Sequence, residues 1–301
     1  MLPLRTRIFR RFLYELSRFG ITQRIALSLT TQVGGRPFRL PVVQGLGIGN
    51  LEITESWMVE IFERLAPPRS GVFLDVGANI GQTLLKLRSR WTDTPWVGLE
   101  PNPACVQYLG QLITANEFRA CELVPVGLHT EAALMKLDFY TADGTDSSAS
   151  LVANFRPNEK VFGHRLICTL PFATIEPFIA RPGVAFVKID VEGGEKEVIE
   201  TLKPVLQSAR PPVLMEILPV YKPENTQRWE RQQAIEQVFR ELNYQIYRVE
   251  KTSVDGFAGL RRLDEIGVHG NLSWADYLVV PKERAEEFLQ PLGEVTVPIA
   301  G

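Results

Sequence analysis

Cysteine and histidine are scarce in this chain of 301 residues, which contains three of each. Cys105, Cys121 and Cys168 lie far apart and form no C-x-x-C pair, which argues against a zinc site and a disulfide framework. No apolar run reaches the roughly 18 to 20 residues that a membrane span needs. Residues 1–20 lack the uninterrupted apolar stretch and cleavage site of a signal peptide. We therefore expect a protein of the reducing cytoplasm.

An excess of charge is lacking as well, because the formal net charge is only −2, and this argues against nucleic acid as a partner. The exception is residues 1–40, where arginines face a single acid, Glu15. Apolar residues recur at helical spacing over residues 8–16, which predicts an amphipathic helix that packs on its own domain or contacts anionic lipid or a partner. We predict a basic, helical N-terminal extension over residues 1–50. Its arginines are Arg5, Arg7, Arg10, Arg11, Arg18, Arg24, Arg36 and Arg39.

From residue 71 onward, short apolar runs of strand-forming residues alternate with helical patterns. Such alternation indicates a parallel sheet that helices cover on both faces. We predict one doubly wound α/β domain over residues 51–301, with six or seven strands, mostly parallel and with an antiparallel C-terminal strand. The predicted strands lie at 71–76, 94–100, 121–126, 184–190, 211–217, 244–249 and 275–280.

The stretch "VFLDVGANIGQT" at residues 72–83 joins the first of these strands to a helix through a glycine loop. In an open α/β sheet the ligand crevice lies beyond the carboxyl ends of the strands, where the strand order reverses. Residues at the ends of four strands should therefore meet in one crevice. The predicted ligand-binding residues are Asp75, Gly77, Ala78, Asn79, Gly81, Glu100, Pro101, Asn102, Val126, Gly127 and Asp190.

The loop differs from a dinucleotide fingerprint, because Asn79 stands where the second glycine of G-x-G-x-x-G would admit a pyrophosphate. Asp75 would repel a pyrophosphate and favour a ligand with a positive charge. Glu100, about 20 residues further on, suits the hydroxyls of a ribose. These features favour S-adenosylmethionine and a class I methyltransferase, Rossmann-like fold over a nicotinamide oxidoreductase. The alternatives are that Asp75 only caps the helix and that Glu100-Pro101 only forms a turn.

A second signal is "VKIDVEGGEKEVI" at residues 187–199, which follows the fourth strand. Asp190 and Glu192 should lie on the same side of the extended chain. Their mutual repulsion in a partly closed site favours one of them as a general base, with His164 as a third catalytic candidate. The alternative for these carboxylates is a divalent cation held with Glu216, through hard oxygen ligands; we predict no metal.

The two motifs together resemble the FkbM family of S-adenosylmethionine-dependent methyltransferases, named for an O-methyltransferase of macrolide biosynthesis. The likeness runs from about residue 57 to 281 and includes Glu100-Pro101 and the serine pair Ser147-Ser148. The chain departs from the family pattern at Glu176, where the family usually has aspartate, and at Gly194, where alanine is usual. The resemblance implies methyl transfer to a hydroxyl of a saccharide, glycolipid or hydroxylated secondary metabolite, with S-adenosylhomocysteine as the product.

The acceptor, a small molecule or glycan, should contact loops 140–165, 218–230 and 250–275. N-methylation or C-methylation stays open, as does a noncatalytic S-adenosylmethionine-binding scaffold, and a homodimer also stays open. His129 could flank the adenine of the cofactor. Aromatic side chains in these loops suit a sugar face, and arginines suit a phosphate or carboxylate on the acceptor. They are Tyr221, Trp229, Phe257 and Trp274, and Arg228, Arg231, Arg261 and Arg262.

Overall fold

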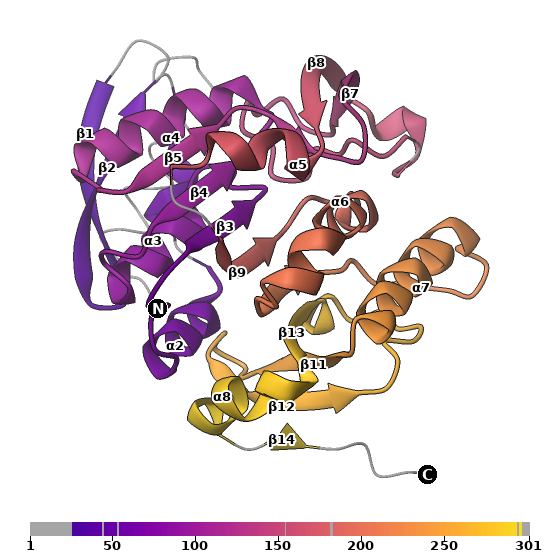
Figure 1. The fold of residues 1–301 in the computed structure, drawn as a ribbon. Helices are drawn as coiled ribbons and strands as arrows, with labels where there is room; N and C mark the ends of the chain where they lie inside the picture. The colour runs from indigo at the N-terminus through magenta and orange to yellow at the C-terminus, as the bar shows by residue number, and fades with distance from the viewer. Residues whose placement is uncertain are drawn as a thin grey trace.

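A nine-stranded sheet runs through the protein and carries helices on both faces (Figure 1). The computed structural model describes residues 26–43, 45–52, 54–153, 155–180, 183–293 and 295–296. The predicted doubly wound α/β fold is confirmed.

The strand order places the first strand of the domain, β3, between β9 and β4. Five neighbouring strands from β5 to β10 are parallel. The late strand β13 is antiparallel and pairs with both β10 and β11, which confirms the predicted antiparallel C-terminal strand. In spatial order the strands are β14 (Val295–Thr296), β12 (Phe257–Leu263), β11 (Tyr244–Lys251), β13 (Asp276–Pro281), β10 (Val213–Glu216), β9 (Val184–Ile189), β3 (Val72–Val76), β4 (Trp96–Leu99) and β5 (Cys121–Val124).

Two hydrophobic cores lie on the two faces of this sheet. The strands are apolar on both faces, as expected for a buried parallel sheet, so successive residues of β3 and β9 enter different cores. One face packs α5 (Phe172–Ile175), α6 (Glu195–Ser208) and α7 (Thr226–Glu241). The other packs α2 (Ser56–Arg64), α3 (Gln82–Arg90), α4 (Pro103–Ala115) and α8 (Ala285–Leu289).

Part of the predicted helical extension is a β-hairpin. Strands β1 (Ala26–Val33) and β2 (Arg36–Val43) pair through a two-residue turn, Gly34-Gly35, in which both glycines have positive φ. A Gly-Gly pair between alternating runs is a hairpin signal, so residues 26–43 correct the helical prediction. Phe38 and other buried side chains of the hairpin pack on α3 and α4, while the predicted amphipathic helix at residues 1–25 lies outside the described residues.

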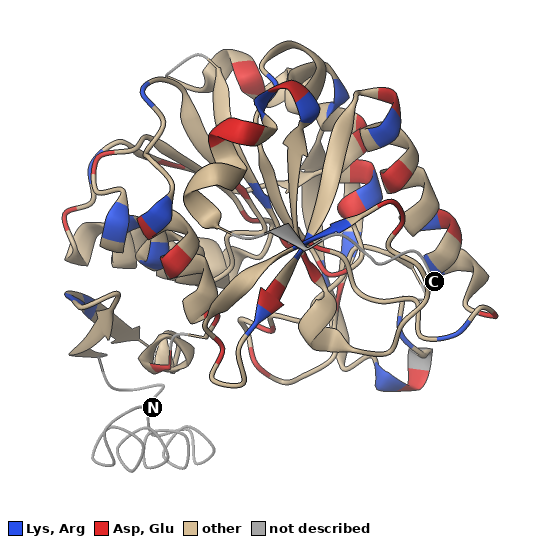
Figure 2. Cartoon of the chain, turned by 90° about the horizontal axis from the view of Figure 1, so that it is seen from below, with Lys and Arg blue, Asp and Glu red and all other residues tan. Residues whose placement is uncertain are grey.

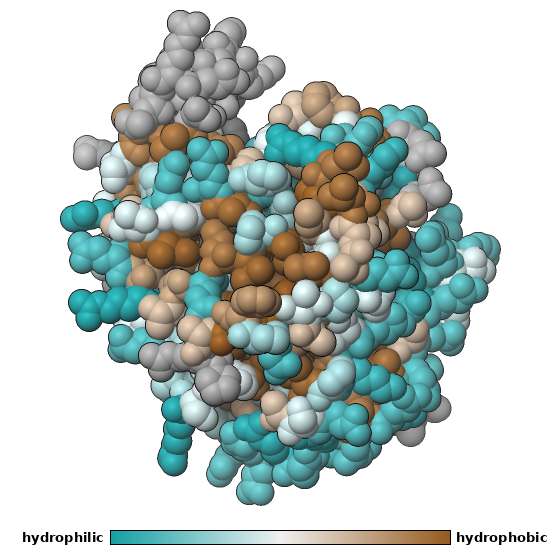
Figure 3. All heavy atoms as spheres, turned by 45° about the horizontal axis from the view of Figure 1, so that its top comes forward, coloured by the Kyte–Doolittle hydropathy of each residue, from teal (hydrophilic) through white to brown (hydrophobic). Residues whose placement is uncertain are grey.

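A small three-stranded sheet is inserted between β5 and β9. It consists of β6 (Gly127–Leu128), β8 (Gly163–Leu170) and β7 (Ala133–Phe139). Its inner face carries Leu137 and Ile167, whereas its outer face exposes Leu134 and Leu166; Figure 3 shows apolar side chains gathered on the side of the molecule that carries this sheet. Acidic and basic residues alternate along the outer helices in Figure 2.

No helix in the described part of the chain is long and apolar enough to span a bilayer. Short 3-10 turns complete the chain: η2 (Ile48–Leu51), η3 (Asn158–Lys160), η4 (Glu176–Phe178), η5 (Leu272–Trp274), η6 (Lys282–Arg284) and η7 (Gln290–Leu292).

Phe186 of β9 should contribute most to the stability of the second core, which is the one that α2, α3, α4 and α8 cover. Its ring stacks on Phe73 at 5.2 Å between centroids and contacts the rings of Phe62 and Trp91. Replacing it with alanine should lower the free energy of unfolding by about 3–5 kcal/mol, because the cavity cannot collapse within such a cluster. Urea denaturation measures this loss. Phe178→Ala is the matched control, since its ring is 82% exposed, and its change should stay within about 0.5 kcal/mol.

Candidate functional site

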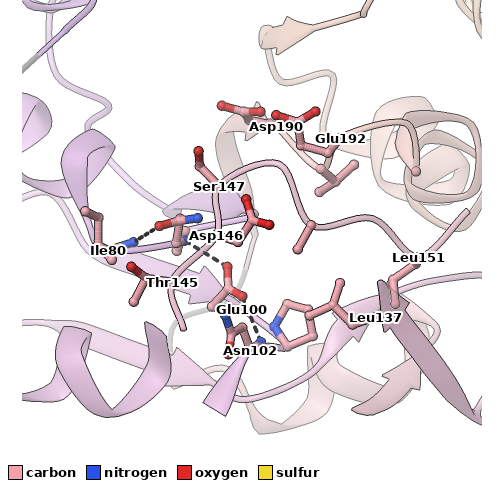
Figure 4. Close-up of a pocket in the computed structure, with 18 of the residues that line it drawn as sticks. Ile80, Glu100, Asn102, Leu137, Thr145, Asp146, Ser147, Leu151, Asp190 and Glu192 are labelled. Carbon is pink, nitrogen blue, oxygen red and sulfur yellow. Dashed lines mark hydrogen bonds between the residues drawn. The ribbon is translucent and has the colours of Figure 1, made fainter. Parts of the chain in front are cut away.

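A cavity of about 1250 Å³ opens beyond the carboxyl ends of β3, β4, β9 and β10. It lies where the strand order reverses, between β3 and β9, as the sequence predicted. A pocket for one small ligand measures roughly 300 to 1000 Å³, so this cavity is larger than one small ligand needs. Figure 4 shows Asp190 and Glu192 side by side at one end and Glu100 with Asn102 at the other, with residues 145–147 between them.

The glycine loop after β3 lets two backbone segments approach closely. Gly77 has a φ of +85°, and a Cβ there would lie 1.9 Å from the carbonyl oxygen of Asp190. The amide of Gly77 donates to Leu99 O at 2.9 Å, and the amide of Asp190 donates to Val76 O at 3.0 Å. The loop therefore joins the ends of β3, β4 and β9 and fixes the floor of the cavity.

Glu100, directly after β4, organises the loop on the other side. Its Oε2 accepts from the Asn79 amide and its Oε1 from the Asn102 amide, both at 2.8 Å. Burial raises the pKa of Glu100 to about 7, although these two amide bonds lower it. Each carboxylate oxygen keeps a free lone pair, so Glu100 can accept hydrogen bonds from two hydroxyls of a ligand in the cavity.

Three carboxylates meet at the opposite end. Asp190, Glu192 and Glu216 place oxygens within 4.8 Å of one another. Burial, together with the neighbouring charge of Asp190, raises the pKa of Glu192 to about 7 and raises that of Glu216 further. Glu192 has a φ of +51°, a strained conformation of the kind found at functional sites.

One buried cation lies beside Asp190, and a second lies beside Glu55. The Lys188 ammonium is 1% exposed and lies 3.4 Å from Asp190, and the Lys86 ammonium donates to Glu55 at 2.5 Å. Burial would raise the pKa of Glu55, but Lys86 and Lys188 lower it to about 2. On the outer side, the Arg156 guanidinium lies 3.3 Å from Glu192. Opposite charges thus hold these carboxylates in fixed positions.

The loop after β7 closes the middle of the cavity and is organised by Asp146. This buried carboxylate accepts from the amides of Tyr140, Thr141 and Ser148 and from the Ser148 hydroxyl, at 2.7 to 3.0 Å. Burial opposes ionisation, but these hydrogen bonds lower the pKa of Asp146. The loop is also anchored to the segment that follows β4, because the Asn102 side chain donates to Gly144 O at 2.8 Å.

Most of the predicted ligand-binding residues line the cavity, but two do not. Asp75 is the last but one residue of β3 and points into the α2–α3 layer, where it accepts from the Trp96 indole at 3.1 Å. Gly81 packs against Leu112 of α4. Asp75 therefore does not face the crevice that the sequence predicted for it. The residues that do line it are Gly77, Ala78, Asn79, Glu100, Pro101, Asn102, Val126, Gly127 and Asp190.

His164 is not part of the site, which corrects the third catalytic candidate. It lies within β8 opposite Asp138. Because side chains alternate along a strand, Arg165, which bonds Asn102 at 2.9 Å, faces inward and His164 faces solvent. His129, in contrast, lines the cavity next to Val126 and Gly127.

The predicted acceptor loops contribute unequally. Residues 141–153 line much of the cavity, and Gln227 and Arg231 line it from α7. Loop 250–275 contributes none of its described residues. The four aromatic residues proposed from the sequence do not line the cavity either, and Phe257 is buried in the second core.

Three functional residues were missed from the sequence. Asp146 had a signal, because an aspartate two residues before Ser148 favours an Asx turn. Lys188 had one as well, since a lysine inside an apolar strand needs a buried partner. Glu55, which reaches the cavity from before α2, had none that we can identify.

The lining favours a positively charged ligand with hydroxyl groups. Among the described lining residues Arg231 is the single Lys or Arg, and it pairs with Glu197. A pyrophosphate would therefore meet repulsion here. The acids that line the cavity are Glu55, Glu100, Asp143, Asp146, Asp190, Glu192, Glu197 and Glu216.

The chain is similar to known proteins. The methyltransferase FkbM domain matches residues 75–246, more than half of the chain. Among solved structures, a methyltransferase FkbM from Methylobacillus flagellatus KT matches with 15% identity over 70% of this chain and 43% of that chain, with a TM-score of 0.41. The present chain thus spans less than half of that protein.

Two further structures contain a cofactor. TYW2 from M. jannaschii, in complex with AdoMet, matches with 12% identity over 84% of this chain and 83% of that chain, with a TM-score of 0.39. Cofactor-bound Rv0187 from MTB matches with 10% identity over 75% and 78%, with a TM-score of 0.42. A comparison with curated proteins found no match.

Gly77 should tolerate no side chain. In Gly77→Ala the new Cβ would clash with Asp190 O in a left-handed conformation, so the free energy of unfolding should fall by about 2 kcal/mol or more. Gly110→Ala is the matched control in α4, where a Cβ meets nothing within 4 Å; it should stabilise the helix by about 0.5–1 kcal/mol. Equal denaturation midpoints for the two variants would contradict the geometry.

Proposed function

The chain belongs to the FkbM family of methyltransferases, and we propose that it transfers a methyl group from S-adenosylmethionine to a hydroxyl of a saccharide, glycolipid or hydroxylated secondary metabolite. One observation carries this proposal: a single cavity joins Glu100, which suits a ribose, to the carboxylates Asp190 and Glu192, which suit a proton acceptor. An amine that is already unprotonated needs no such base, so the presence of these carboxylates favours a hydroxyl acceptor over an amine.

The residues present fit the cofactor. Gly77 brings the backbone of the glycine loop to the cavity, Glu100 would accept from the ribose hydroxyls, and Val126, Gly127 and His129 would border the adenine. The acidic lining would favour the positive charge of the methionine part. S-adenosylmethionine supplies a methyl group activated by its sulfonium and leaves as neutral S-adenosylhomocysteine.

Glu192 is the proposed base. An alcohol becomes a competent nucleophile as its proton is removed, and a carboxylate with a pKa near 7 is well matched to this task at neutral pH. The acceptor oxygen would form its bond to the methyl carbon while its proton passes to Glu192. Asp190, fixed by Lys188, would orient the acceptor hydroxyl. Positioning the oxygen about 3 Å from the methyl carbon should supply much of the acceleration.

The same three carboxylates are spaced as the ligands of a divalent cation would be. The cationic side chains of Lys188 and Arg156 already lie beside Asp190 and Glu192, and Glu216 has a raised pKa that favours its neutral form. The proposed reaction therefore uses protein cations, and a metal centre is the second candidate that the carboxylate cluster supports.

Glu100 should control cofactor affinity. In Glu100→Gln the amide group would face one of the backbone N–H groups of Asn79 or Asn102, so S-adenosylhomocysteine should bind about tenfold more weakly or worse. In the wild type the hydroxyls should bind the ionised carboxylate. With a pKa of about 7, affinity should be constant above that pH and fall below it, and the variant should lose this dependence.

Isothermal titration calorimetry from pH 5.5 to 8.5 measures both effects. Asp75→Asn is the control, because Asp75 is also a buried acid with a pKa raised by burial to about 7, yet it does not line the cavity. Its affinity should stay within about threefold of wild type. A loss equal to that of Glu100→Gln would contradict the assignment of the ribose position.

Glu192 should control methyl transfer but not cofactor binding. In Glu192→Gln, transfer of labelled methyl groups from S-adenosylmethionine to a panel of hydroxylated saccharides and glycolipids should fall by about 10²- to 10⁴-fold, because the proton acceptor is lost. The affinity for S-adenosylhomocysteine should stay within about threefold. Unchanged transfer would remove Glu192 as the base.

Two controls separate the alternatives. Transfer that stops with EDTA and returns with Mg²⁺ would make the three carboxylates a metal centre, whereas we expect transfer to survive chelation. Tight cofactor binding without methylation of any hydroxyl or amine acceptor, in wild type and variant alike, would favour a noncatalytic scaffold.

A further inference from the structure

Arg228 of α7 is a half-buried guanidinium that has no carboxylate partner among the described residues. Its single hydrogen bond is to Phe155 O at 3.5 Å, and its charge lies 4.3 Å from the centroid of the Phe155 ring. A guanidinium has five donors, so most of the bonding capacity of Arg228 is unused. The preceding residue of α7, Gln227, lines the cavity, and the Phe155 ring that Arg228 contacts packs on Gly193, beside the lining residue Glu192.

The other arginines that the sequence offered for an anionic group already have partners. Arg231 pairs with Glu197 and also donates to Gly193 O. Arg261 pairs with Glu250 at 2.7 Å, and Arg262 lies 3.6 Å from Asp264. Arg228 therefore differs from this group, because it makes no ion pair among the described residues, and the charges of Glu192 and Glu195 act on it only from beyond ion-pair distance.

A second guanidinium, that of Arg156, pairs with Glu192, which lines the cavity. Arg156 is 3.3 Å from Glu192 and 4.7 Å from the centroid of the Tyr140 ring. Burial and the nearby positive charge of Arg156 lower the pKa of Arg228, which agrees with the two groups being neighbours. The Phe155 ring that supports Arg228 packs on Gly193, where a Cβ would lie 2.4 Å from the ring. Both arginines thus border the Glu192-Gly193 turn.

We propose that Arg228 and Arg156 form a subsite for a phosphate group on the methyl acceptor. Guanidinium groups bind phosphate through paired N–H donors, and two of them suit a group with close to two negative charges. This inference rests on the proposed function, because it names the chemical class of the acceptor. A phosphate held on the rim beside Glu192 would leave a hydroxyl of the same molecule within reach of that carboxylate.

The subsite also explains the contrast between the rim and the interior of the cavity. The interior is lined by acids, which would repel a phosphate and keep it at the mouth. The acceptor would therefore enter in one orientation, with its phosphate outside and its hydroxyl inside. Specificity of this kind comes from repulsion as well as attraction.

The test is a calorimetric titration of the full chain, saturated with S-adenosylhomocysteine, with inorganic phosphate against a chloride background of equal ionic strength. Phosphate should bind the wild type, and at least tenfold more weakly Arg228→Gln and Arg156→Gln. Arg240→Gln is the control, since Arg240 is an exposed residue of α7 and should leave the affinity unchanged. Absent binding in wild type, or equal binding in all four proteins, would overturn the subsite.

Two further measurements keep this result separate from the proposed function. S-adenosylhomocysteine should bind wild type, Arg228→Gln and Arg156→Gln with equal affinity, which would also show that the variants fold. If wild type does not bind S-adenosylhomocysteine, the methyltransferase function is contradicted. The phosphate titration, repeated without S-adenosylhomocysteine, still tests the subsite in that case. Sedimentation with phosphatidylcholine vesicles that contain phosphatidic acid distinguishes the sources. Arg228-dependent vesicle binding supports a lipid phosphate, and binding of free phosphate alone supports a soluble acceptor.

Discussion

The close contact between Gly77 and the carbonyl of Asp190 is the constraint on which the rest of the site depends. It exists because β3 and β9 are adjacent parallel strands that leave the sheet in different directions. Only a residue without a Cβ lets their ends touch. One wall of the cavity extends from this junction through Asn79 to Glu100. The other wall begins at Glu192. The residues proposed to hold the cofactor and those proposed to hold the acceptor thus meet at one backbone junction, and such a fixed arrangement suits catalysis by positioning.

The charges at this junction form a second level of organisation. Carboxylates that converge in a partly buried cleft would normally protonate or move apart, because both desolvation and repulsion oppose their ionisation. Here the buried ammonium of Lys188 faces Asp190, and burial, which would lower the pKa of Lys188, is outweighed by Asp190, Glu55 and other acids that raise it. The lysine stays charged and keeps Asp190 in place, while Glu192 is left with a pKa near 7. Asp190 thus pairs with a fully buried lysine, whereas Glu192 pairs with the partly exposed Arg156.

The sequence predicted what depends on chain order and missed what depends on side-chain direction. Glu100, Asp190, Glu192 and Glu216 were placed correctly, since the ends of parallel strands meet at one edge. Asp75 was misplaced because β3 is apolar on both faces, so the pattern gave no indication of which face its aspartate takes. The prediction that His164 reaches the site was wrong for a related reason. Alternation along β8 predicts the direction of its side chain only once the inward face of that strand is known. The hairpin at residues 26–43 was different, because its Gly-Gly turn was readable and was overlooked.

In the proposed function, the inserted segment between β5 and β9 forms the acceptor side of the cavity. Leu137 of β7 and Leu151 of the segment between β7 and β8 form an apolar wall of the cavity. Asp146 fixes the loop that closes the cavity. From the same insertion Arg156 reaches Glu192, and Arg228 approaches from α7 on the far side of Phe155. In the proposed function, recognition of the acceptor therefore depends on this insertion and on α7, whereas methyl transfer depends on the residues at the strand ends.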